Sequence, residues 1–123
     1  MKYDDLLNLP YEDFGRFGKN KGLDCYGVVL EMCRRHGTPL KDIVYPEPHI
    51  SVDKLGLYYR NINAREISFE QVKEGDVLQC IYNGNLHLAF ILSKEMVIHA
   101  TNKGVRITPL TAFTNKKYFR VIK

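Results

Sequence analysis

The second half of the chain is a series of short apolar segments separated by turn residues, and this pattern restricts the fold more than any other feature. The segments cover residues 77–82, 86–92, 96–100, 105–108 and 118–122. Asn83-Gly84, between the first two, is typical of two-residue hairpin turns, in which both positions take positive φ. Connections this short make neighbouring strands antiparallel. The pattern predicts an antiparallel sheet of about five strands.

The first half of the chain predicts helices. Residues 23–36 place apolar side chains at helical spacing. Asp24 is a suitable N-cap, because its carboxylate can accept a hydrogen bond from an unpaired backbone N–H, and Gly37 suits the left-handed position that follows a helix. Shorter helical segments are expected at residues 3–9, 51–60 and 68–72. Helices followed by strands predict an α+β fold with N-terminal helices packed on a C-terminal sheet.

The length of 123 residues suits a single domain, which we expect to cover residues 1–123. No stretch of about 18 apolar residues is present, so we expect no membrane span. The first residues carry two acids and no long apolar run, which argues against a secretory signal. We therefore expect a cytoplasmic protein as synthesised, which would reach a cell wall or a virion by another route.

The formal net charge of +4 is mild, and the basic residues are scattered along the chain. A nucleic-acid-binding protein is expected to concentrate basic residues in a patch or stripe. The sequence therefore predicts no nucleic-acid partner.

The chain has three cysteines, Cys25, Cys33 and Cys80. An odd number without a signal peptide argues against a disulfide framework. No pair has the C-x-x-C spacing of structural zinc sites, and we expect neither a metal nor a cofactor. Cys33 and Cys80, like His36 and His49, are expected to have structural roles.

Cys25 is the candidate nucleophile because it directly follows the predicted N-cap. The positive end of the helix dipole and the unpaired N–H groups stabilise a thiolate, which predicts a lowered pKa for Cys25. The same N–H groups can stabilise an oxyanion at an attacked carbonyl. The alternative is a small buried residue at a helix start, a common position for a free cysteine.

Two histidines, His87 and His99, lie within apolar strand segments. A buried imidazole needs polar partners, and both needs are met if the two rings bond each other and one faces Cys25. The alternative is that each ring is satisfied separately. If a three-residue loop at 93–95 places Leu92 opposite Met96, the two histidines become diagonal neighbours on one face of the sheet. The sequence therefore predicts an odd-numbered loop or a bulge there.

These parts predict a nucleophile–base–orienter triad. His87 would take the proton from Cys25, and the sulfur would attack an amide carbonyl. His99 would hold the ring and the tautomer of His87, the role of the third member in such triads.

Four blocks of the sequence, in order, resemble the NlpC-type cell-wall peptidases. Residues 22–29, GLDCYGVV, resemble the family's G-x-D-C-S-G-L-V block, and residues 73–78, KEGDVL, resemble L-x-x-G-D-L-V. Residues 87–92, HLAFIL, resemble H-V-G-I-Y-L, and residues 96–100, MVIHA, resemble M-I-H-A.

The resemblance implies a papain-like fold and hydrolysis of peptidoglycan stem peptides, at the bond between γ-D-glutamate and a diamino acid. It implies that Cys25 is the nucleophile, His87 the base and His99 the third polar residue. The family often places a tyrosine upstream of the cysteine block near the substrate, and Tyr11 is the nearest match. Asp24 and Tyr26 flank the nucleophile and are also expected to contact substrate.

Some positions depart from the family pattern. Tyr26 stands where many members have serine, and an aromatic residue there resembles members encoded in phage tail gene clusters. This departure suggests a phage or prophage origin, with phage tail proteins as partners. Two alternatives stay open: a thiol amidase or acyltransferase with the same triad and another substrate, and a non-catalytic phage tail or structural domain that keeps the fold.

Overall fold

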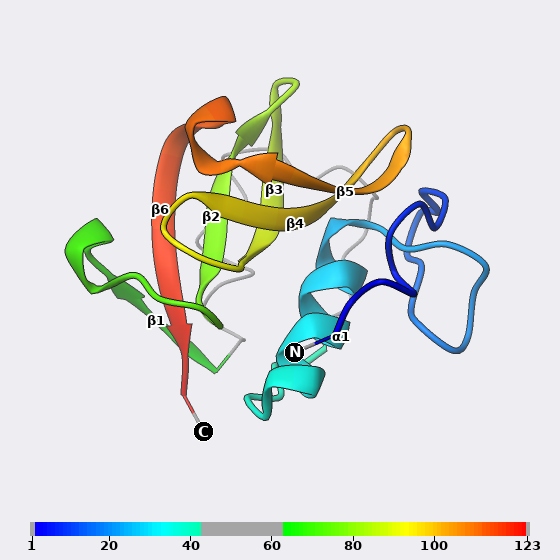
Figure 1. The fold of residues 1–123 in the computed structure, drawn as a ribbon, viewed down its shortest axis with the longest axis horizontal. Coiled ribbons are helices and arrows are strands. Elements are labelled where there is room, and N and C mark those ends of the chain that lie inside the picture. Colours follow the sequence, from blue (N-terminus) through cyan, green and yellow to red (C-terminus); the bar gives the residue numbers. More distant parts are fainter. Residues whose placement is uncertain (1, 43–62, 123) are drawn as a thin grey trace.

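The computed structural model describes residues 2–42 and 63–122. Its elements, in chain order, are α1 (Cys25–His36), β1 (Ala64–Ile67), the 3₁₀ turn η2 (Phe69–Gln71), β2 (Val77–Tyr82), β3 (Asn85–Ile91), β4 (Met96–Thr101), β5 (Gly104–Pro109), η3 (Leu110–Ala112) and β6 (Thr114–Val121). The strands form one antiparallel sheet in the order β1-β6-β2-β3-β4-β5, and α1 packs against β3 and β4 (Figure 1). The predicted α+β class is confirmed.

Helix α1 begins and ends as its sequence predicts. The Asp24 side chain accepts a hydrogen bond from the backbone N–H of Gly27 at 2.7 Å, which is an N-cap interaction. Gly37 has a φ of 81° and donates its N–H to carbonyls of the last turn. The last turn carries basic side chains, and positive charge there stabilises the helix by interacting with the negative end of its dipole.

The predicted hairpin and loop are also confirmed. Asn83 and Gly84 have φ values of 52° and 79°, so the turn between β2 and β3 has positive φ at both central positions. Between β3 and β4, the N–H of Leu92 donates to the carbonyl of Met96 at 3.0 Å. Residues 93–95 therefore form the predicted odd-numbered loop, which places His87 and His99 on the same face of the sheet.

The structure adds one strand to the predicted sheet and removes one predicted helix. The sheet has six described strands, one more than the predicted number of about five, because β1 pairs antiparallel with β6 at the sheet edge. This strand was missed because its four residues, AREI, bury only Ile67 and show no apolar run. Residues 3–9 form successive turns instead of a helix, with Asn8 at a φ of 71°.

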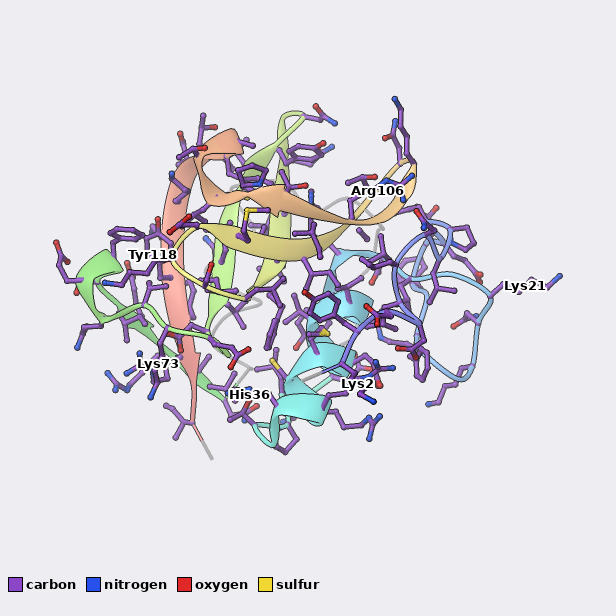
Figure 2. All side chains as sticks on the ribbon, in the orientation of Figure 1. Lys2, Lys21, His36, Lys73, Arg106 and Tyr118 are labelled. Atoms are coloured by element: carbon purple, nitrogen blue, oxygen red, sulfur yellow. The ribbon has the colours of Figure 1, made fainter. Side chains whose placement is uncertain are left out.

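The remaining helical predictions have different outcomes. Residues 68–72 do contain a helical turn, η2. The helix predicted at 51–60 lies outside the described residues. The turns at 3–9 are fixed by tertiary contacts. The Asn8 N–H donates to the Val105 carbonyl at 3.0 Å, and Arg106 donates to the Asn8 side chain at 2.7 Å. Figure 2 shows Arg106 on β5, on the side of the sheet where the N-terminal segment lies. Backbone groups of this segment thus form hydrogen bonds with β5 in place of hydrogen bonds within a helix.

The sheet buries apolar side chains on both of its faces. One cluster joins the buried face of α1 to one face of β3 and β4, through residues such as Met32, Leu88 and Phe90. The other cluster includes Ala89, Val97 and Phe113. Side chains alternate along a strand, so His87 and His99 project on the face of the second cluster.

Candidate active site

Cys25 is the first residue of α1, and its environment is built by the N-cap. Asp24 is 1% exposed, and its Oδ1 accepts hydrogen bonds from Gly27 and from Nη1 of Arg16, the latter at 2.9 Å. Arg16 also bonds Asp42 through Nε at 3.1 Å. A buried carboxylate is costly unless it is paired and hydrogen-bonded, and Arg16 meets that need.

Asp24 and Tyr26, two of the three predicted substrate contacts, take part in internal packing. The Tyr26 side chain is 3% exposed, its hydroxyl donates to the Lys41 carbonyl, and the Arg16 guanidinium lies 5.6 Å from its ring centroid. Neither Asp24 nor Tyr26 is among the described residues that line the pocket beside Cys25.

Tyr11, the third predicted contact, does line that pocket. Its segment runs beside the chain that leads into α1: Leu23 donates its N–H to the Pro10 carbonyl at 3.0 Å, and the Leu23 carbonyl accepts from Glu12 at 3.2 Å. These bonds make a parallel bridge between Tyr11 and Leu23. Tyr11 is therefore held beside Leu23, which lies two residues before the start of α1 at Cys25.

Glycines allow this close packing of loop and helix. A Cβ on Gly27 would lie 2.2 Å from the Gly15 carbonyl oxygen, and a Cβ on Gly22 would lie 2.2 Å from the Pro10 carbonyl oxygen. No side chain fits at those distances. The glycines that the sequence places around Cys25 thus let backbone approach backbone.

His87 and His99 contact each other directly. His87 Nε2 lies 2.8 Å from His99 Nδ1, and the two rings are nearly perpendicular, at 85°. The strands pair Phe90 with Ile98 and Ile91 with Val97, and this register makes the histidines diagonal neighbours. The predicted bond between the rings is confirmed.

Three further residues complete the surroundings of the histidines and were missed in the sequence. Thr108 Oγ1 lies 2.8 Å from His99 Nε2. Ring centroids of Tyr82 and Phe113 lie 4.9 and 6.1 Å from that of His87. The positions of Tyr82 and Thr108 could have been predicted from the hairpin register, because each is a diagonal neighbour of its histidine on the adjacent strand. No local sequence pattern predicts that Phe113 lies beside the histidines.

The sheet opens where Cys25 approaches it. The recorded pairing of β3 with β4 ends at Phe90 and Ile98, although the same register would next place Ala89 opposite His99 and Leu88 opposite Ala100. The backbone N–H of Leu88 bonds to the sulfur of Cys25 instead. Through this opening, a thiol from the α1 side reaches the edge of β3 next to His87.

A pocket of about 270 Å³ lies at the same place. It is lined by Cys25, His87 and Tyr11 together with residues of the two adjacent hairpins: Tyr82, Asn83, Asn85, Leu86, Ala100, Thr101 and Asn102. Cys25 and His87 thus line the same pocket. His99 is not among the lining residues and contacts the His87 ring instead.

The charge states of the site differ from the sequence prediction. Burial, with the Asp24 carboxylate, raises the pKa of Cys25 to about 12, whereas we expected the helix dipole to lower it. Hydrogen bonds from the N–H groups of Leu88 and Tyr26 act in the lowering direction but do not prevail. Burial lowers the pKa of His87 to about 3, with a further contribution from His99, and lowers the pKa of His99 to about 4. These shifts favour the neutral thiol and the neutral imidazoles over their charged forms.

Among residues 2–42 and 63–122, no group of three or more His, Cys, Asp or Glu side chains is arranged to hold a metal ion. In the same part of the chain, none of the helices has the length and apolarity to cross a membrane. The polar groups of the site are thus a thiol, two imidazoles, hydroxyls and amides, a set that suits nucleophilic and acid–base chemistry.

A comparison with protein families matches residues 10–123 to the model of the NlpC/P60 family. The chain belongs to the NlpC/P60 family. Its members are usually cysteine peptidases or amidases, and the family has a function of the cell-wall peptidase type. The resemblance seen in the four sequence blocks is thus confirmed.

Solved structures agree on the NlpC/P60 fold. A Staphylococcus aureus protein described as similar to a lipoprotein of the NLP/P60 family matches with a TM-score of 0.62 and 21% sequence identity. The match covers 97% of this chain but only 38% of the S. aureus chain. No curated protein matches the sequence.

Proposed function

We propose that this NlpC/P60 domain is a cysteine endopeptidase that hydrolyses amide bonds in peptidoglycan stem peptides, at γ-D-glutamyl–diamino acid linkages. The observation that carries the proposal is that Cys25 and His87 line one pocket while His87 is bound through Nε2 to His99. A nucleophile, a base and an orienting group are the minimal set for acyl transfer through a covalent intermediate.

In the proposed reaction, the Cys25 thiol gives its proton to Nδ1 of His87 as the sulfur attacks the substrate carbonyl carbon. Coupling the two events avoids a free thiolate in a partly buried position, which the raised pKa of Cys25 disfavours. Backbone N–H groups at the start of α1 stabilise the oxyanion. The C–N bond then breaks, His87 returns the proton to the leaving amine, and a thioester remains on Cys25.

Water completes the cycle. His87 takes a proton from the water as its oxygen attacks the thioester carbonyl, and the thiol leaves with that proton, which restores Cys25 and releases the acid. His99 keeps the ring of His87 in place through both steps. Of the predicted substrate contacts, the proposal keeps Tyr11, which lines the pocket. Asp24 and Tyr26 are given a supporting role through the helix cap and its packing.

The test is digestion of defined muropeptides followed by mass spectrometry of the products. We expect a new γ-D-glutamyl carboxyl terminus and a new diamino acid amine. Cys25→Ala should abolish turnover. Cys33→Ala, which removes a buried thiol near the C-terminal end of α1, should retain turnover. Both variants should keep the wild-type circular dichroism spectrum.

The alternatives appear as different products. Cleavage of another amide, or transfer of the acyl group to an amine instead of water, would support a thiol amidase or acyltransferase. Absence of turnover by a folded wild-type protein on every muropeptide would reject the peptidase and favour a non-catalytic domain, such as a phage tail component.

A further inference from the structure

His99 has a second polar contact on the side of its ring away from His87. Its Nε2 atom lies 2.8 Å from Oγ1 of Thr108 on β5. The strands pair Val97 with Thr108 and His99 with Arg106, so Thr108 is a diagonal neighbour of His99 on the same face. Only 1% of His99 is exposed, and Thr108 is half-buried. Among the described residues, the Thr108 hydroxyl is thus a polar partner of this buried nitrogen.

The direction of these contacts follows from proton counting. A neutral imidazole has one protonated nitrogen, which donates, and one bare nitrogen, which accepts. A base that accepts at Nδ1 of His87 requires the proton of His87 on Nε2, facing His99. His99 must then accept at Nδ1 and carry its own proton on Nε2, facing Thr108.

We infer that Thr108 is a positioning residue: its hydroxyl accepts the Nε2 proton of His99 and so fixes the tautomer that allows His87 to act as a base. The catalytic consequence rests on the proposed peptidase function. With its proton on Nδ1, His99 would donate to Nε2 of His87, and the proton of His87 would move to Nδ1. That is the nitrogen that must be bare to accept the proton of Cys25.

The energetic argument supports the same direction. Without the hydroxyl, the tautomer required for catalysis would leave the Nε2–H of His99 as a buried donor without its recorded acceptor. An unsatisfied buried donor costs more than a hydrogen bond gains, because its desolvation is not compensated. In the opposite tautomer the Nε2 atom of His99 is bare and loses only a donor, and a buried acceptor without a partner is tolerated better than a buried N–H without one. The opposite tautomer would then be favoured.

The first experiment measures the tautomer in the wild-type protein. Histidine labelled with ¹⁵N allows NMR to distinguish protonated from bare ring nitrogens, and a His99→Gln variant assigns the signals. We expect His99 to be protonated at Nε2 and bare at Nδ1 near neutral pH. A proton on Nδ1 of His99 would overturn the inference without any variant of Thr108.

The second experiment compares Thr108→Val, which removes the hydroxyl at nearly constant shape, with Thr108→Ser, which keeps it. The valine variant should move the proton of His99 to Nδ1 and lower kcat about tenfold or more, with KM little changed. The serine variant should restore both the spectrum and kcat. Thr111→Val, at an exposed threonine in η3, is the matched control and should behave as wild type.

The outcomes separate this inference from the proposed function. A valine variant with wild-type kcat and an unchanged His99 spectrum would reject a role for Thr108 in an active peptidase. If the wild-type protein hydrolyses no muropeptide, the proposed function fails, and the spectra still decide whether Thr108 sets the tautomer. If Thr108→Val does not fold, the wild-type and Thr108→Ser spectra decide the same question.

Discussion

The backbone N–H of Leu88 bonds to the sulfur of Cys25 at the point where β3 and β4 have separated. The Leu88 N–H lies beyond the paired part of β3 and β4, and its partner is the thiol at the start of α1. The contact favours the thiolate, yet burial and the Asp24 carboxylate outweigh it. The resting charge of Cys25 is therefore decided by its surroundings in the fold.

We predict that Cys25 is a neutral thiol in the resting protein. Because its pKa is raised to about 12, the ultraviolet difference between wild type and Cys25→Ala should show no thiolate absorbance between about pH 5 and 8. Cys33 and Cys80 have pKa values raised to about 12 by burial, so they add no signal in this range. A titration step below pH 7 would show that a resting ion pair with His87 exists.

We predict unequal losses from the two histidines. His87→Gln removes the proposed base and should lower kcat by a factor of about 10² to 10⁴. His99→Gln removes only the partner at 2.8 Å, so it should leave more residual turnover than His87→Gln. Turnover is measured on the same muropeptides, with unfolding midpoints as the control for folding. Equal activity of His99→Gln and wild type would remove His99 from the triad.

We predict that stability rises with pH between about pH 5 and 7.5. The pKa values of His87 and His99 are lowered to about 3 and about 4 in the fold, so the unfolded chain binds more protons in this window. Between about pH 7.5 and pH 5, each histidine should lose about 2 kcal/mol of its stabilising contribution, which is fully present above the unfolded pKa and falls further as the pH approaches the folded value. Urea unfolding at both pH values measures the difference.

The control for that measurement is the double variant His87→Gln/His99→Gln, which should show a much weaker pH dependence. Carboxylates with lowered pKa values, such as Glu31, titrate below the window and do not interfere. A double variant with the wild-type slope would mean that other groups produce the pH dependence.

We predict that Gly27→Ala destabilises the protein by about 2 kcal/mol or more, despite the better helix propensity of alanine. The added Cβ would lie 2.2 Å from the Gly15 carbonyl oxygen, a backbone atom that cannot move alone. Gly18→Ala is the matched control: its φ of 81° is unfavourable for alanine, but no atom lies within 4 Å of the added Cβ. It should cost about 1 kcal/mol. Equal losses in denaturant unfolding would contradict the steric explanation.

The sequence by itself determined the features that depend on neighbouring residues. Asp24 and Gly37 bound the helix because capping uses side chains and backbone within one turn. Asn83-Gly84 and the loop at 93–95 fixed the strand register, and the register brought His87 and His99 together. These local rules were sufficient to predict the fold class and the contact between the two rings.

Only the tertiary structure decided the rest. The strand β1 exists because β6 pairs with it, and residues 3–9 form turns because β5 binds them. The pKa of Cys25 depends on burial, which no local pattern reports, and burial reversed the direction that the helix dipole alone predicts. Desolvation and strand pairing sum contributions from distant parts of the chain, so they become defined only when those parts are packed together.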